Sequence, residues 1–124
     1  MRIAQVAPLF ERVPPTTYGG TERVVSYLTD ELVKLGHDVT LFASGDSRTA
    51  ATLVPMRARS TRTDPSCQDP LACHLLMLER VARAARDFDV VHFHNISLVG
   101  GPAIIPWSQN ELHTPSETLA PGRL

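Results

Sequence analysis

The sequence predicts an α/β protein built on a mostly parallel sheet with helices on both faces. Short apolar runs of strand length alternate with amphipathic segments of helix length, and a new apolar run follows each amphipathic segment. Strands separated by helices of this kind join through right-handed crossovers and pair in parallel. We therefore expect a Rossmann-like sheet, and 124 residues are enough for one such domain.

The first third of the chain predicts a strand, a long loop and a helix. The strand covers residues 2–7 and ends at Pro8, and the loop continues to Gly19. The helix covers residues 21–35, and Gly36 then supplies the left-handed position that ends it. Its apolar positions recur at helical spacing, and we expect Glu22 to lie among the charged residues of the opposite face. The apolar positions are Val24, Val25, Leu28, Leu32 and Leu35.

The middle of the chain predicts three more strands and a second helix. Apolar runs at 39–43 and 89–94 are typical of buried parallel strands, and 51–54 is a third candidate. The polar, proline-marked segment 57–70 has no regular pattern. The second helix ends near Asp87, and its apolar positions are Leu71, Leu75, Leu76, Leu78, Val81, Ala82 and Ala85.

The last stretch, 96–124, has four prolines and keeps neither the helix nor the strand period. One short strand around 103–105 is possible. We therefore expect a Rossmann-like domain core at 1–95 and an irregular or divergent segment at 96–124, so that the sheet is incomplete at its C-terminal end.

Composition argues against several partners. The net charge is −1 and charged residues are spread along the chain, which does not favour nucleic acid. No apolar run approaches the ~20 residues of a membrane span, and the first residues lack the order of a secretory signal. We expect a cytoplasmic protein. Cys67 and Cys73 are expected to be reduced and inert.

Gly19 and Gly20 stand just before the first predicted helix. Free backbone N–H groups and the positive end of the helix dipole attract anions there, and glycine lets a phosphate approach closely. A diphosphate is the natural ligand. The alternative, equally weighted, is that the glycines only turn the chain into a helix that Thr21 caps. The dinucleotide motif G-x-G-x-x-G is absent, which argues against nicotinamide and flavin cofactors.

His92 and His94 are two residues apart on a predicted strand, so both side chains should project from the same face, with Phe93 on the other. One or both are candidates to contact substrate hydroxyls or phosphate. A buried structural role is an equal alternative for His92, which lies further into the strand. A metal site ranks lowest because no third ligand can be placed. His113 is an isolated histidine, and His74 and His37 are expected to be structural or exposed.

Several segments together resemble the N-terminal half of bacterial retaining glycosyltransferases of the GT-B type, the group-1 family that uses nucleotide-activated sugars. The resemblance covers Met1 to about Asn95. It is carried by "MRIAQVAPLFERVPP", "YGGTERVVSYLTDELVKLGHDVTLFASGDS", "LLMLERV" and "FDVVHFHN".

The resemblance implies two Rossmann-like domains facing across a cleft, with the acceptor bound mainly by the first and the nucleotide sugar mainly by the second. It implies that Gly19, Gly20 and Thr21 lie against the donor diphosphate without a metal or other cofactor, and that His92, His94 and Asn95 line the acceptor side. The nearest match to the family's catalytic histidine is His113 in "ELHTP", although the preceding residues are more polar than the family's strand.

Two hypotheses follow. The leading one is an acceptor-side glycosyltransferase domain without its donor-binding second domain, and therefore inactive alone, whose partners are a nucleotide sugar and a sugar, lipid or small-molecule acceptor. A separate second GT-B half and a second copy of the chain are further candidate partners. The alternative is a non-catalytic Rossmann-like domain that binds a partner protein or a nucleotide.

Overall fold

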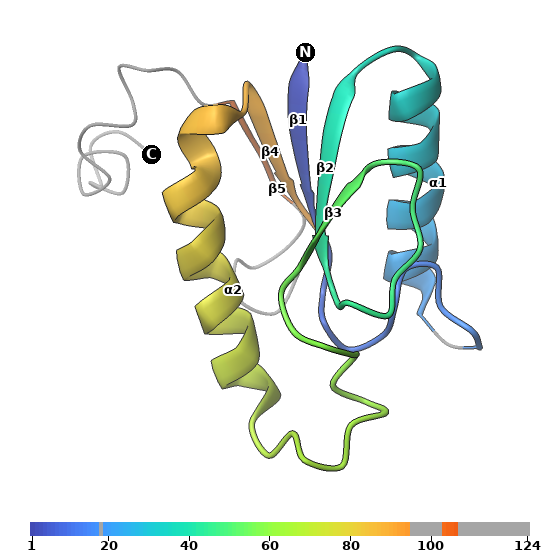
Figure 1. Ribbon diagram of the computed structural model, residues 1–124, viewed down its shortest axis with the longest axis vertical. Coiled ribbons are helices and arrows are strands. Elements are labelled where there is room, and N and C mark those ends of the chain that lie inside the picture. Colours follow the sequence, from blue (N-terminus) through green and yellow to red (C-terminus); the bar gives the residue numbers. More distant parts are fainter. Residues whose placement is uncertain (18, 95–102, 107–124) are drawn as a thin grey trace.

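A computed structural model describes residues 1–17 and 19–94 and the backbone of 103–106, and it confirms the α/β, Rossmann-like architecture (Figure 1). Every predicted strand and helix is present, with boundaries that differ by a few residues. The elements are β1 (Arg2–Val6), α1 (Gly20–Lys34), β2 (Asp38–Ala43), β3 (Thr52–Pro55), α2 (Pro70–Ala84), the 3₁₀ turn η1 (Ala85–Asp87), β4 (Val90–Phe93) and β5 (Ala103–Pro106).

The sheet has the strand order β3-β2-β1-β4-β5. The first four strands in this order are parallel, and β5 pairs antiparallel with β4. β1 is central and β4 lies directly beside it, as the site prediction requires. In this register Gln5 of β1 lies opposite Leu41 of β2 and His92 of β4. These three side chains therefore share one face of the sheet.

The two helices cover opposite faces of the sheet (Figure 1). On the α2 face, Met77, Val81 and Ala85 pack against alternate strand residues to form the larger core. That core comprises Ala4, Val6, Leu9, Phe42, Met77, Val81, Ala85, Val91 and Phe93. On the α1 face the apolar cluster is smaller and comprises Ala7, Val13, Val25, Leu41 and Ala43.

The predicted inward face of α2 is partly wrong. Leu71, Leu75 and Leu76 are 53–66% exposed, whereas His74 and Met77 are buried. Both sets recur at helical spacing, so periodicity alone cannot choose between them. The buried side of α2 is the one whose residues, including Met77 and Val81, pack against residues of β1, β2 and β4.

The predicted inward face of α1 is also partly wrong. Val24 and Leu35 are 57% and 72% exposed, while the buried residues of the helix include Glu22, Ser26 and Thr29 beside Val25. These polar residues lie on the same side of α1 as Val25, which belongs to the apolar cluster of that face. Glu22 was expected on the outer face, and it is buried.

The helix ends explain where the chain turns. Gly36 follows α1 with φ 90°, as predicted for the left-handed position after a helix. The Asp69 side chain caps α2 by accepting hydrogen bonds from the backbone N–H groups of Leu71 and Ala72. Within the described residues, neither helix combines the length and the apolar character that crossing a bilayer requires.

Candidate functional site at the carboxyl edge of the sheet

The carboxyl ends of β1 and β4 meet at one edge of the sheet. The backbone N–H of His94, the residue after β4, donates to the carbonyl oxygen of Val6, the last residue of β1, at 2.9 Å. The loop from Ala7 to Gly19 and the end of β4 therefore leave the sheet side by side. In open parallel sheets this junction is where ligands bind.

His92 and His94 project from the same face of the sheet, as predicted. Their ring centroids are 3.9 Å apart and the rings are inclined by 37°. Phe93, between them, packs into the core on the α2 face. Because Gln5 is paired with His92, the two histidines and Gln5 form one polar group on the α1 face.

His94 is the more deeply buried histidine of the pair. Its side chain is 5% exposed, and its Nε2 donates to the Gln5 Oε1 at 2.7 Å. Burial, assisted by His92, lowers the pKa of His94 to about 4. The ring is therefore neutral at pH 7, and its Nδ1 is left as a hydrogen-bond acceptor.

His92 is only partly buried, and burial also lowers its pKa. The histidine that is buried and hydrogen-bonded within the protein is thus His94. The sequence favoured His92 for this structural role because His92 lies further into the strand. Depth in the strand did not predict burial because the Gln5 side chain reaches His94 from the neighbouring strand.

The glycine pair forms the start of α1. Gly19 is the N-cap with φ 117°, and Gly20 is the first residue of the helix. Thr21 follows inside the helix, so the alternative is wrong in making Thr21 the cap, although the glycines do turn the chain into the helix. The φ of Gly19 favours glycine, and a Cβ there would also lie 2.8 Å from the Glu22 Oε2 and 3.1 Å from the Pro15 Cβ, so those neighbours would have to shift. A Cβ on Gly20 would meet nothing within 4 Å.

Glu22 places a carboxylate against Gly19 at the positive end of α1. The side chain is 5% exposed. Burial raises the pKa of Glu22, and the charge of Glu11 adds to this rise, while the Glu22 backbone N–H and Arg62 oppose it. A carboxylate of the chain itself therefore already contacts the helix end where an external anion was expected.

The loop after β1 is held by residues 57–67, by α2 and, through Val13, by Ser47 and Arg48 of the loop after β2. Glu11 is 6% exposed and pairs with Arg62 at 2.9 Å. The carbonyl oxygens of Leu9 and Phe10 accept from the N–H groups of Thr61 and Arg62 at 2.8 and 3.1 Å. Residues 57–67, which have no regular secondary structure, therefore form one wall of the loop.

His74 of α2 anchors the same loop, so its predicted structural role is confirmed. The Leu9 N–H donates to the His74 Nε2 at 2.9 Å, and the His74 Nδ1 donates to the Pro70 carbonyl at 2.6 Å. Burial lowers the pKa of His74, which keeps the ring neutral in this arrangement.

Two predicted site residues, Asn95 and His113, lie outside the described residues. Among the residues that are described, no group of three or more His, Cys, Asp or Glu side chains could hold a metal ion. Of the predicted site residues that are described, His92 and His94 lie in contact with each other. Gly19, Gly20 and Thr21 lie at the start of α1, the helix that covers the same face of the sheet.

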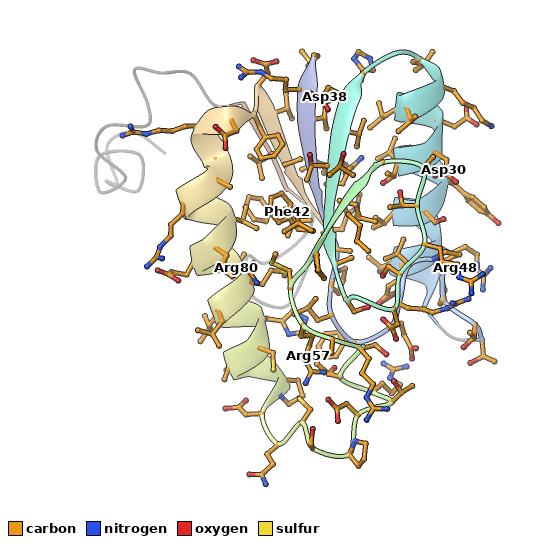
Figure 2. All side chains as sticks on the ribbon, in the orientation of Figure 1. Asp30, Asp38, Phe42, Arg48, Arg57 and Arg80 are labelled. Carbon is orange, nitrogen blue, oxygen red and sulfur yellow. The ribbon has the colours of Figure 1, made fainter. Side chains whose placement is uncertain are left out.

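A separate groove of about 410 Å³ lies on the α2 face. Thr40, Phe42 and Val54 of the sheet and Arg80 of α2 are among its lining residues, and Figure 2 shows Phe42 and Arg80 between the sheet and the helix. The groove lies on the face opposite the histidine pair, so it is not part of the candidate site.

Three parts of the site were not predicted from the sequence. Gln5 is a polar residue within a buried apolar strand, and that exception was a usable signal. Glu22 lies in the first turn of a helix, where a carboxylate is favourable, which was a second signal. The pairing of Glu11 with Arg62 joins distant segments and left no local pattern.

The fold and the position of these polar residues define a Rossmann-like domain whose candidate site lies where β1 and β4 leave the sheet. The chain belongs to Glycosyltransferase Family 4, whose family model matches residues 18–115. The matched range includes the glycine pair from Gly19, both site histidines and His113. No curated protein matches the chain.

Proposed function

We propose that this domain forms the acceptor-side wall of a retaining, GT-B-type sugar-transfer site that uses a nucleoside diphosphate sugar as donor. Family membership over residues 18–115 supports the reaction class. The meeting of the β1 and β4 ends is the observation that supports the proposed site, because it brings His94 beside Val6, after which the loop that leads to Gly19 begins.

In this proposal the histidine pair binds the acceptor. A neutral His94 whose Nε2 hydrogen is held by Gln5 has its Nδ1 lone pair free to accept a hydrogen bond from an acceptor hydroxyl. His92, beside it, provides a second polar ring for another hydroxyl. Gln5 is a positioning residue, because it fixes which His94 nitrogen carries the proton.

The start of α1 binds the diphosphate in this proposal. The first N–H groups of a helix have no partner within the helix, and here they belong to Gly20 and Thr21. Preorganised donors of this kind stabilise the charge that grows on a leaving diphosphate, and they require no metal. Glu22 must turn away or be protonated when the anion binds, because its carboxylate contacts the same helix end.

We expect the 124-residue chain to bind without turning over. Transfer requires the acceptor to be held in line with the sugar at about 3–3.5 Å while donors stabilise the leaving group. The described groups account for the acceptor side and part of the diphosphate contact. A second domain, as in the GT-B resemblance, would supply the rest.

The test is calorimetric titration of the full chain with uridine diphosphate and guanosine diphosphate, followed by Gly20→Asp. The new side chain has open space and suits the first turn of a helix, so the fold should be retained. We expect at least one of the two diphosphates to bind, and the added charge to weaken that binding by about tenfold or more, because it stands where the anion approaches.

The matched control is Ala50→Asp, which adds the same charge at an exposed loop position. Equal weakening by both variants would indicate a general charge effect and contradict the phosphate loop. Failure of the unmodified chain to bind either diphosphate would contradict it directly.

One observation favours the second candidate, a protein-docking domain. Leu71, Leu75 and Leu76 form an exposed apolar stripe on α2. If the chain binds neither diphosphate but sedimentation shows stable self-association that Leu75→Lys abolishes, the docking function is the better assignment.

A further inference from the structure

Cys67 and Cys73 lie next to each other at the start of α2, in a part of the molecule that the sugar-transfer site does not use. Their Sγ atoms are 3.8 Å apart, and both thiols are free and half-buried. They are the only cysteines of the chain. The sequence alone suggested two inert thiols, and this proximity points to chemistry instead.

We propose that Cys67 and Cys73 are a site of reversible oxidation, where a small disulfide of the glutathione type converts the two thiols into an intramolecular disulfide. An S–S bond is about 2.05 Å long, so the two side chains need only a small rotation to close it. Cys73 is fixed in the first turn of a capped helix, and Cys67 belongs to the irregular segment just before it.

The reaction balances in two exchange steps. The thiolate of Cys67 attacks one sulfur of the small disulfide, which releases one small thiol and leaves a mixed disulfide on Cys67. The thiolate of Cys73 then attacks the Cys67 sulfur, which forms the intramolecular bond and releases the second thiol. The pair loses two electrons and two protons, and the small disulfide gains both. Burial and the neighbouring Cys67 raise the pKa of Cys73, which favours this order of attack.

The bond would tie residues 57–67 to α2, and both of these hold the loop after β1. Residues 57–67 bind that loop through Thr61 and Arg62, and α2 binds it through His74, directly after Cys73. Closing the disulfide therefore restrains the segments that hold the loop after β1, which leaves the sheet beside the end of β4. This inference does not depend on whether the site binds a nucleotide sugar.

The first test treats the folded full chain with oxidised glutathione and measures free thiols and intact mass. We expect both thiols to disappear and the mass to fall by about 2 Da without a glutathione adduct. Cys67→Ser and Cys73→Ser should each instead keep one mixed disulfide with glutathione. A chain that retains both thiols, carries two glutathiones or forms cross-linked dimers would overturn the proposal.

The second test measures amide hydrogen exchange on the reduced and the oxidised chain. We expect exchange at Thr61 and Arg62 to slow by roughly threefold or more on oxidation, because their N–H groups bind the loop after β1. The Gly36 amide, bonded at the far end of α1, should not change and serves as the control. Unchanged exchange at Thr61 and Arg62 in a chain that has formed the disulfide would overturn the proposed restraint of the segments that hold the loop after β1.

Discussion

The two faces of the sheet bury side chains of different polarity. The face under α2 is apolar, and its core residues Met77, Val81 and Val91 are at most 2% exposed. The face under α1 buries Gln5 and His94 from the strands and Glu22 from the helix. One side of the same sheet thus provides most of the apolar burial, and the other buries polar side chains.

The polar face carries a cost in stability. Among the described residues, the buried Gln5 Nε2 and Thr29 Oγ1 have no hydrogen-bond partner. Each buried polar atom left in this state costs about 1–3 kcal/mol. The buried Arg12 Nε in the loop after β1 and the Thr61 Oγ1 in residues 57–67 are in the same state.

The largest expected change in stability comes from truncating a core residue on the α2 face. Met77→Ala removes a side chain that is 1% exposed and should lower the free energy of unfolding by about 2–5 kcal/mol. Leu76→Ala, next to it on the helix but 66% exposed, is the matched control and should change stability by less than about 0.5 kcal/mol. Urea unfolding measures both, and equal losses would contradict the assigned helix face.

The next effect is a pH dependence of the polar face. The pKa of His94 is about 4 in the folded chain, against an ordinary value of 6.5. Between these pH values His94 is protonated in the unfolded chain but not in the folded chain. The contribution of neutral His94 to the free energy of unfolding is therefore complete above pH 6.5 and is lost as the pH falls toward 4. From pH 7 to pH 5 the loss is about 2 kcal/mol.

Urea unfolding of the wild-type chain and His94→Gln at pH 7 and pH 5 isolates this term. His74 and His92, whose pKa values burial also lowers, add losses of the same sign, and Glu22, whose pKa burial raises, acts in the opposite direction. All three residues remain in the variant, so the comparison measures the loss that depends on His94, including its effect on the adjacent His92. The variant should lose less stability than the wild type, and His37→Gln, at a partly exposed turn, should behave like the wild type.

A smaller effect tests how the glycine loop is built. Gly19→Ala must place a side chain at φ 117° and against the Glu22 carboxylate, which should cost about 1–3 kcal/mol in unfolding free energy. The loss should be smaller in Gly19→Ala/Glu22→Ala than the sum of the two single changes, because the two residues touch. Strict additivity in this cycle would contradict the contact.

The smallest effect has the opposite sign. Gly20→Ala adds a methyl group in open space within the first turn of α1 and should stabilise the chain by about 0.4–1 kcal/mol. Thermal unfolding is sensitive enough to detect this gain. A loss of stability would mean that the backbone at Gly20 needs the freedom of glycine.

Most of the fold could be predicted from the sequence because local patterns encode it. The apolar runs at 39–43 and 89–94 and the stop at Gly36 depend on neighbouring residues alone, and all three predictions are confirmed. The inward faces of the helices could not be predicted reliably, because leucines at helical spacing continue around α2. Which of them face inward depends on the contact with the sheet.

The candidate site was predictable only in part. The shared face of His92 and His94 follows from the period of a strand. The bond from His94 to Gln5 and the pair between Glu11 and Arg62 join residues far apart in the chain, so no local pattern contained them. The burial of Glu22 depends on how closely α1 packs against the rest of the domain, which cannot be predicted from local sequence.

The borders of the sheet carry a consequence for how the chain behaves at high concentration. The outermost strands, β3 and β5, span four residues each and finish in Pro55 and Pro106. Proline has no N–H to offer to an incoming strand, and short borders give little length for one to pair with. Within the described residues, both edge strands of the sheet are therefore poor templates for the edge-to-edge pairing that starts fibrils.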